Sequence, residues 1–337
     1  MKSGYQYFVV MLIFVGLVVS CGGEDGGVTE IVETAQVAVE EELDFGATAV
    51  TDLNLDVSVP LIVFNSTRDG NFEIYTMLPN RSEVNNLTNH PAEDVMPSWS
   101  GDGKHIVFVS DRAGDYNLYV MAADGSGLRQ LTDDVGADIM PHWSPQGDRI
   151  AFTSERNGKT EIYTIMSDGS DLRQISGEGL HEEMAPRWSP DGAAILFLAD
   201  RDVLSESEDG GNPVLYMMKA DGSDIELIDS ESNYYTPAAW SPDGRKIVYG
   251  AQEGDFFDLF ILDMETKERV HFLSYSSRDI WPSWSPDGTR LAFTSLYTSN
   301  PEIYVVDLVS GDVEQLTDNV DQVNSLPEWQ PVGGGGE

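Results

Sequence analysis

The sequence predicts an all-β fold, a six-bladed β-propeller, and three observations support this prediction. A tryptophan recurs at nearly constant spacing, each copy is followed by a turn related to Ser-Pro-Asp-Gly, and short alternating apolar segments fill the intervals. The tryptophans stand 44, 45, 52, 44 and 45 residues apart, at Trp99, Trp143, Trp188, Trp240, Trp284 and Trp329. A period of this length, built from short strands without intervening helices, is typical of a propeller blade.

Each repeat is expected to contribute four strands. After the turn at 143–147, residues 150–154 alternate apolar and polar, and residues 161–166 form a second short segment before Asp168-Gly169. Asp-Gly between such segments is a strong hairpin signal, and proline followed by Asp-Gly suits a tight turn. The six tryptophans are expected to be core residues packed between blades.

The register of the repeats predicts how the ring closes. The first set of three strands, starting at residue 61, has no tryptophan strand before it, and the last tryptophan strand has no set after it. Residues 326–330 should therefore pair with the strands in 61–88 and complete one blade. Such pairing between the C-terminal strand and the N-terminal blade leaves no free sheet edge.

The N-terminus resembles that of a bacterial lipoprotein. Residues 1–20 are expected to be a signal peptide, with Lys2 before an apolar stretch too short for a comfortable membrane span, and Cys21 is the predicted lipidation site. An uncleaved short anchor and an ordinary secretory signal are the alternatives. Residues 21–58, with ten acidic residues and no Lys or Arg, are expected to be a flexible tether, 59–331 the propeller, and 332–337 a disordered Gly-rich tail.

The charge balance restricts the partners. The formal net charge is −39, from 58 acidic residues against 19 Lys and Arg. Such a surface repels nucleic acid and anionic lipid, so we expect no nucleic-acid binding, contact with the membrane through the lipid anchor only, and attraction of a basic partner. No phosphate loop, Cys/His cluster or Ser-His-Asp pattern is evident, so the sequence predicts that the protein is not an enzyme.

The repeat resembles that of TolB-type propellers. The resemblance rests on Trp-Ser-Pro-Asp-Gly, then Ile-x-Phe-x-Ser-x-Arg, Ile-Tyr-x-Met and Asp-Gly-Ser, and it covers residues 60 to about 331. It implies a protein of the cell envelope, at the outer membrane or in the periplasm of a Gram-negative host. It also implies binding to other proteins, notably a peptidoglycan-associated lipoprotein. Similar repeats occur in propellers of prolyl-oligopeptidase relatives and of carbohydrate-active proteins.

One set of candidate site residues lies five positions before each repeat tryptophan, at Asp94, Asp138, Glu183, Tyr235, Asp279 and Asn324. Symmetry is expected to gather them around the mouth of the channel, on the face where the tryptophan strands begin. Convergent carboxylates there would suit Ca²⁺, and no other cofactor is expected. The alternatives are a partner-binding surface and structural ion pairs with Arg68, Arg112, Arg156 and Arg201, which recur in the neighbouring hairpins.

A second set consists of aromatic residues in loops expected on that same face: Tyr234, Tyr235, Phe256, Phe257, Trp281 and Tyr297. Aromatic residues are enriched at interaction hot spots, and Trp281, which breaks the period, is expected to be exposed. The sequence therefore predicts a non-enzymatic envelope lipoprotein that acts as a scaffold and binds an envelope protein or peptide. The alternative is a carbohydrate-binding or carbohydrate-active propeller with an acidic, cation-binding channel mouth.

Overall fold

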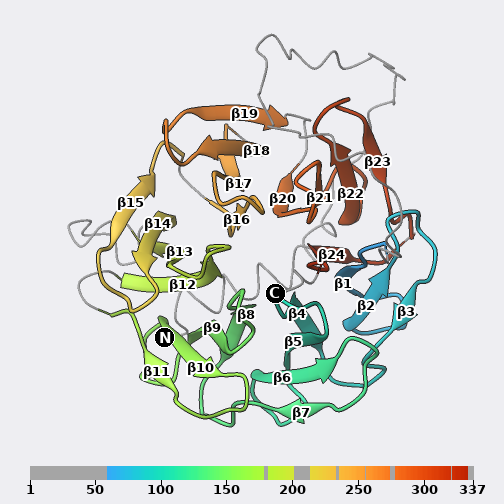
Figure 1. Ribbon diagram of the computed structural model, residues 1–337. Coiled ribbons are helices and arrows are strands. Elements are labelled where there is room, and N and C mark those ends of the chain that lie inside the picture. The colour runs from blue at the N-terminus through green and yellow to red at the C-terminus, as the bar shows by residue number, and fades with distance from the viewer. Residues whose placement is uncertain are drawn as a thin grey trace, which may run out of the picture.

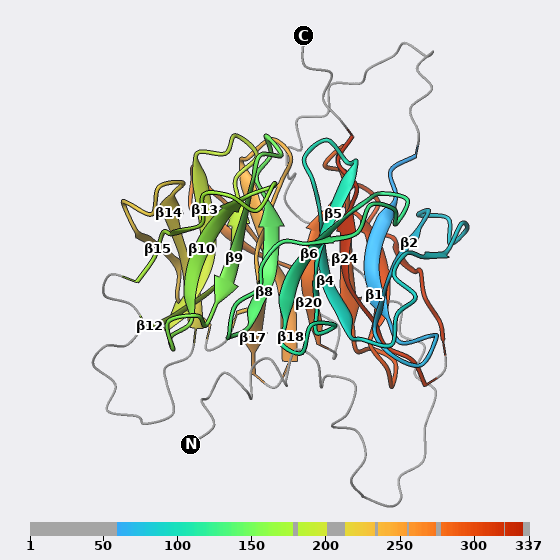
Figure 2. The same cartoon turned by 90° about the horizontal axis from the view of Figure 1, so that it is seen from below.

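Six four-stranded antiparallel sheets are arranged as blades around a ring in the computed structural model (Figure 1). The structure describes residues 59–177, 181–200, 213–232, 235–254, 256–273, 278–319 and 321–332. Seen from the side, the inner strands run through the thickness of the disc (Figure 2). The predicted six-bladed propeller is confirmed.

The four strands of each blade are given from the innermost strand outward. The first blade contains β24 (Asn324–Trp329), β1 (Ile62–Ser66), β2 (Glu73–Met77) and β3 (Asn85–Asn86). The second and third contain β4 (Asp94–Trp99), β5 (His105–Ser110), β6 (Asn117–Ala122) and β7 (Arg129–Gln130), then β8 (Asp138–Trp143), β9 (Arg149–Ser154), β10 (Glu161–Met166) and β11 (Arg173–Gln174). The fourth contains β12 (His181–Trp188), β13 (Ala194–Asp200), β14 (Pro213–Lys219) and β15 (Glu226–Asp229). The fifth and sixth contain β16 (Ala239–Trp240), β17 (Lys246–Glu253), β18 (Phe256–Asp263) and β19 (Arg269–Leu273), then β20 (Asp279–Trp284), β21 (Arg290–Ser295), β22 (Glu302–Asp307) and β23 (Val313–Gln315).

The first blade joins the two ends of the propeller. Ile62 in β1 pairs with Trp329 in β24, and Ser66 pairs with Asn324. β24 therefore supplies the innermost strand of a blade whose other strands come from the start of the ring. The closure predicted from the register is confirmed.

The Ser-Pro-Asp-Gly segments form tight turns between the first and second strands of a blade. In the turn after Trp188, the Gly192 N–H donates to the Ser189 carbonyl at 2.9 Å, and Gly192 has a φ of 71°. The Ser189 hydroxyl donates to Asp191 at 2.6 Å, and this hydrogen bond holds the pKa of Asp191 below its usual range. The residue types of the repeat thus satisfy the turn's own polar groups.

The core consists of one apolar layer within each blade and tryptophans between blades. In the first blade the ring centroids of Phe64 and Tyr75 lie 5.7 Å apart, and equivalent aromatic pairs occur in the other five blades. Five of the six repeat tryptophans are buried, as expected, whereas Trp240 is partly exposed.

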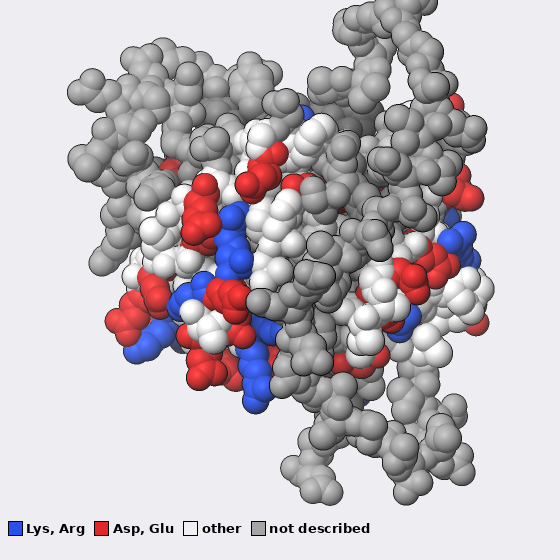
Figure 3. Space-filling model, turned by 90° about the horizontal axis from the view of Figure 1, so that it is seen from above, with Lys and Arg blue, Asp and Glu red and all other residues white. Residues whose placement is uncertain are grey.

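We call the end of the disc where the inner strands begin the top face, and the end with the Ser-Pro-Asp-Gly turns the bottom face. Around the edge of the disc, basic side chains lie among acidic ones (Figure 3). One such ion pair joins Arg269 and Glu231 at 3.0 Å. The predicted signal peptide, Cys21, the predicted tether, Arg201, residues 202–212, Tyr234 and residues 333–337 lie outside the described residues. Over the described ranges, no helix could cross a membrane.

Candidate functional site

The inner strands share a bulge that shapes the channel. Three residues before the tryptophan, five of the six blades place a non-glycine residue at a φ between 52° and 57°, namely Met96, Met140, Ala185, Trp281 and Leu326. All five of these strands also shift register against their second strand around this position. A left-handed residue inside a strand bends it and redirects its side chains. The repeat therefore presents this position to the channel.

The fifth blade departs from this pattern because proline occupies the equivalent position. Proline fixes φ near −65°, so Pro237 cannot adopt the left-handed conformation. The inner strand β16 is correspondingly reduced to Ala239–Trp240, with only an isolated bridge between Tyr235 and Ala251 above it. One substitution in the repeat thus accounts for the irregular wall of this blade.

A cavity of about 560 Å³ occupies the channel toward the bottom face. Its wall combines four of the five bulge residues (Met96, Met140, Trp281 and Leu326), the repeat tryptophans and prolines from both the inner strands and the turns. Three ionisable side chains line it, His142 from β8, Arg187 from β12 and Glu328 from β24. A largely apolar pocket of this volume with a few polar groups has the character of a small-ligand site.

These three residues occupy one repeat position, directly before the tryptophan. The other blades carry Ser98, Ala239 and Ser283 there. In three blades the side chain at this position accepts a hydrogen bond from the backbone N–H of the tryptophan in the next blade. His142 Nδ1 accepts from Trp188 at 3.2 Å, Ser283 Oγ from Trp329 at 3.2 Å, and Glu328 Oε1 from Trp99 at 2.8 Å. The channel residues thus also join neighbouring blades.

The channel shifts the ionisation of these groups. Burial raises the pKa of Glu328 to about 7, against the opposing effects of the Trp99 N–H, the Arg187 charge and the Ser98 hydroxyl. Burial, and then the charge of Arg187, holds the pKa of His142 well below its usual range. At neutral pH the cavity therefore contains a cationic Arg187, a neutral imidazole and a partly protonated carboxyl group.

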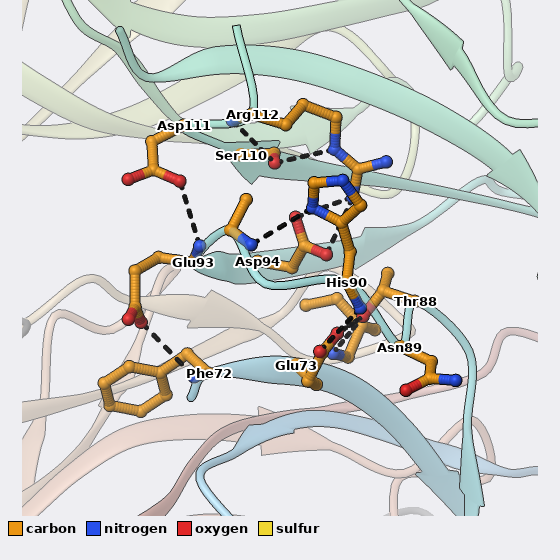
Figure 4. A network of polar contacts seen from close by, with 12 residues as sticks. Phe72, Glu73, Thr88, Asn89, His90, Glu93, Asp94, Ser110, Asp111 and Arg112 are labelled. Carbon is orange, nitrogen blue, oxygen red and sulfur yellow. Dashed lines mark hydrogen bonds and ion pairs between the residues drawn. The ribbon is translucent and has the colours of Figure 1, made fainter. Parts of the chain in front are cut away.

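At the top face, the predicted carboxylates are buried beneath arginines and do not form an open ring around the channel mouth. Asp94 is fully buried, and Arg112 donates through Nη2 to both of its carboxylate oxygens at 2.8 and 2.7 Å (Figure 4). Arg156 contacts Asp138 in the same way at 3.0 Å, and Arg68 donates to Asn324 at 3.1 Å. Each guanidinium also stacks over the third-strand tyrosine of its own blade, with distances to the ring centroid of 4.6 to 4.9 Å.

Neighbouring loops close over these pairs. In Figure 4 the Glu93 N–H donates to Asp111 at 2.9 Å, and the Glu93 carboxylate accepts from the Phe72 N–H at 3.3 Å. Glu183 and Asp279, the remaining two predicted carboxylates, are buried as well, and Ser176 donates to Glu183 at 2.8 Å. Among the described residues no group of three or more His, Cys, Asp or Glu side chains is arranged to hold a metal ion.

The fifth blade replaces the arginine stack by a different buried network. The hydroxyl groups of Tyr235 and Tyr249 both donate to Asp229, the first at 2.9 Å. Arg269 lies 3.2 Å from Asp229 and 3.7 Å from the ring centroid of Phe260. Tyr235 is therefore a buried core residue, 2 % exposed, and the expectation that it lies on an open face is wrong.

Trp281 is also buried, at 6 % exposure, so the expectation of an exposed contact is wrong. Its bulge position directs it into the channel wall beside the cavity. Phe256 and Tyr297, in contrast, are 42 % and 69 % exposed, and Phe257 is partly exposed. Two of the five described candidates in this set are thus enclosed, and three reach the surface.

The exposed aromatic residues lie at the tips of two neighbouring hairpins on the top face. The β17–β18 hairpin is longer than the regular ones by two residue pairs, Gln252 with Phe257 and Glu253 with Phe256. Arg278 joins the hairpins through its backbone, because it forms a bridge with Phe257 and its carbonyl accepts from the Leu296 N–H at 3.0 Å. We call Phe256, Phe257 and Tyr297 the aromatic rim.

The sequence reasoning missed the channel residues His142, Arg187 and Glu328. Their types share no motif, so only their common position before the tryptophan could have identified them. The same register would have placed Trp281 with Met96 and Met140, three residues before the tryptophan, where apolar residues line the channel.

Fold and sites together define a closed six-bladed propeller with a narrow apolar channel and a top face stabilised by buried arginine pairs. The profile of the TolB beta propeller domain matches residues 59–129, 113–207 and 215–335. The chain belongs to this family.

Individual relatives agree with this assignment. An uncharacterised protein of Agrobacterium fabrum is 29 % identical over 128 residues, 38 % of this chain and 42 % of that protein. The Tol-Pal system protein TolB of Francisella tularensis is 30 % identical over 97 residues, 28 % of this chain and 22 % of that protein. The chain therefore matches less than half the length of these relatives. The crystal structure of TolB from Acinetobacter baumannii superposes with a TM-score of 0.69 at 19 % identity, over 81 % of this chain and 67 % of that one.

Proposed function

We propose that this protein is a non-enzymatic lipoprotein of the bacterial cell envelope that binds another protein through the top face of its propeller. The observation that carries the proposal is the aromatic rim, in which two adjacent hairpins hold exposed aromatic side chains near each other. Exposed aromatic residues on a rigid scaffold are typical of interaction hot spots.

Family membership supports a role in protein binding. The Francisella relative is named as a Tol-Pal system protein, and a propeller of the same family here would act as a scaffold in the envelope. The acidic composition favours a partner with a basic surface, since complementary charge accelerates association. Lipidation at Cys21 would hold the disc at the membrane, with residues 21–58 as the tether.

The buried arginine pairs are proposed to act as the support of this face. Arg112 and Arg156 fix the ends of their hairpins to the inner strands of the same blades, so the loops around them are held in place. A partner would then bind a surface that does not need to be ordered first, which reduces the entropic cost of binding.

The test compares the full chain with a Phe256→Ala, Tyr297→Ala variant in cross-linking within native envelopes, followed by direct binding measurements with the purified partner. A Val309→Ala variant is the matched control, because this side chain is 77 % exposed in the turn between β22 and β23, at the bottom face. We expect the rim variant to bind the purified partner at least about tenfold more weakly and the control to bind normally. Equal binding by all three proteins would refute the role of the rim.

A further inference from the structure

The channel cavity contains two opposite charges that do not form an ion pair with each other. Arg187 is on β12 of the fourth blade and Glu328 on β24 of the first, and these blades are three positions apart in a ring of six. The two side chains therefore project from opposite walls of the channel. Within the described ranges, no Arg187 nitrogen lies within 4.0 Å of a carboxylate oxygen.

Each charged group has capacity for a further partner. Arg187 donates through Nη1 to the Pro186 carbonyl at 3.0 Å, and its other N–H groups make no hydrogen bond to described residues. Glu328 accepts the Ser98 hydroxyl at 3.2 Å and the Trp99 N–H at 2.8 Å, both on Oε1. An enclosed guanidinium without a counter-ion is costly, so an anion that enters the cavity would be stabilised there.

The wall between the charges is mostly apolar, with the neutral His142 and Ser283 among its polar side chains. Met96, Met140, Trp281 and Leu326 lie in it, together with prolines and the repeat tryptophans. A ligand that satisfies the whole cavity must therefore carry an anionic group for one side, a cationic group for the other and apolar surface between or beside them. A volume of about 560 Å³ suits a small molecule rather than a folded segment.

We propose that the cavity binds a small zwitterion of the amino-acid or short-peptide class, with its carboxylate on Arg187 and its ammonium group on Glu328. The apolar side chains of the ligand pack against the bulge residues Met96, Met140 and Trp281. This site opens toward the bottom face and is separate from the aromatic rim on the top face.

Isothermal titration calorimetry on the full chain at pH 8 tests the proposal, with L-leucine and the dipeptide leucyl-leucine as probes. The two probes separate a free amino acid from a short peptide as the ligand. We expect at least one to bind, and Arg187→Gln and Glu328→Gln each to weaken that binding at least about tenfold. Arg173→Gln and Glu314→Gln, whose side chains are 62 % and 60 % exposed, are the matched controls and should bind normally.

Ligands with one charged end blocked show which end of the ligand contacts Arg187 and which contacts Glu328. N-acetyl-leucyl-leucine lacks the ammonium group, so it should bind wild-type protein weakly, and Glu328→Gln should reduce that binding little further. Leucyl-leucine amide lacks the carboxylate, so it should bind wild-type protein weakly, and Arg187→Gln should reduce that binding little further. Circular dichroism establishes that both variants are folded. No binding of either probe at millimolar concentration, or equal binding by wild-type and Arg187→Gln proteins, would overturn the proposal.

Discussion

Arg112 donates through one nitrogen, Nη2, to both carboxylate oxygens of Asp94, which has no exposed surface. Two other hairpin arginines reach the residue equivalent to Asp94 in their own blades, and in the first blade this residue is a neutral asparagine, Asn324. The arginine is thus retained where its partner carries no charge, which indicates that stacking on the tyrosine contributes alongside the ion pair.

Removal of one member of this pair should be far more damaging than removal of both. Arg112→Met leaves a buried carboxylate without its cation, and we expect a loss of about 3–5 kcal/mol in the free energy of unfolding. The double variant Arg112→Met, Asp94→Asn should recover most of this loss. Urea unfolding measures both effects, and equal stability of the single and double variants would contradict the account.

Glu328 predicts an unusual dependence of stability on pH. Its carboxyl pKa is raised to about 7 in the folded protein, whereas the unfolded chain has an ordinary value of about 4.3. Between these values the folded state holds a proton that the unfolded state releases, so this contribution to stability is full below pH ~4.3 and is lost as pH rises through 7.

The variant Glu328→Gln should therefore lose less stability than wild-type protein between pH 5 and pH 8. Between these pH values, the free energy of unfolding should fall by roughly 2 kcal/mol more in wild-type protein than in the variant, after allowance for partial exposure of the side chain to the channel. Urea unfolding at both pH values measures it, with Glu314→Gln as an exposed control. Parallel changes in all three proteins would show that Glu328 titrates normally.

The bulge predicts that a glycine will stabilise the protein at one position. Ala185 is buried with a φ of 56°, a conformation that costs an L-residue about 1 kcal/mol. Ala185→Gly should therefore raise the free energy of unfolding by up to about 1 kcal/mol, whereas Ala185→Val should lower it. Ala151→Gly, in the regular part of β9, is the matched control and should destabilise by roughly 0.5–1 kcal/mol. Destabilisation by both glycines would mean that the bulge is not strained.

Ring closure predicts that deletion of residues 326–331 affects every blade. These residues include most of β24, which pairs with β1 and packs beside the neighbouring blades. The shortened chain should lose the cooperative thermal transition of the whole disc, as followed by circular dichroism and tryptophan fluorescence. A melting temperature equal to that of the full chain would refute the structural role of the closure.

The proposed lipid anchor predicts that Cys21→Ser releases the protein from the membrane fraction when it is expressed in a bacterium. Metabolic labelling with a fatty-acid analogue should mark the wild-type chain and not the variant. Labelling of both proteins would place the modification elsewhere, and absence of membrane association in the wild-type chain would exclude the anchor.

The fold was predictable because its signals are local and repeated six times. Trp143, Pro145 and Gly147 specify a turn in residues adjacent in sequence, and the same pattern recurs at the blade period. The closure of the ring could be predicted because the first repeat lacks a tryptophan strand and the last tryptophan strand has no set after it. None of these inferences required knowledge of which side chains meet across the ring.

The channel site was not predictable in the same way, because its chemistry depends on departures from the repeat. Arg187 and Glu328 are 141 residues apart and face each other only because six blades close into a circle. Tyr235 was misplaced for a related reason. Its hydroxyl group binds Asp229 together with that of Tyr249, which stands where the other blades have phenylalanine, so an apparent surface aromatic belongs to an internal network.

The pairing of β1 with β24 also constrains how this protein is made. Ile62 emerges early during synthesis, but its partner Trp329 is translated 267 residues later. The first blade therefore stays incomplete, with one strand edge of β1 unpaired, until nearly the whole chain has left the ribosome. Pairing over such a sequence separation is slow, and an unpaired edge invites association with other chains. We propose that this chain is exported, and a propeller that cannot close before its last strand arrives would then still be incomplete during translocation.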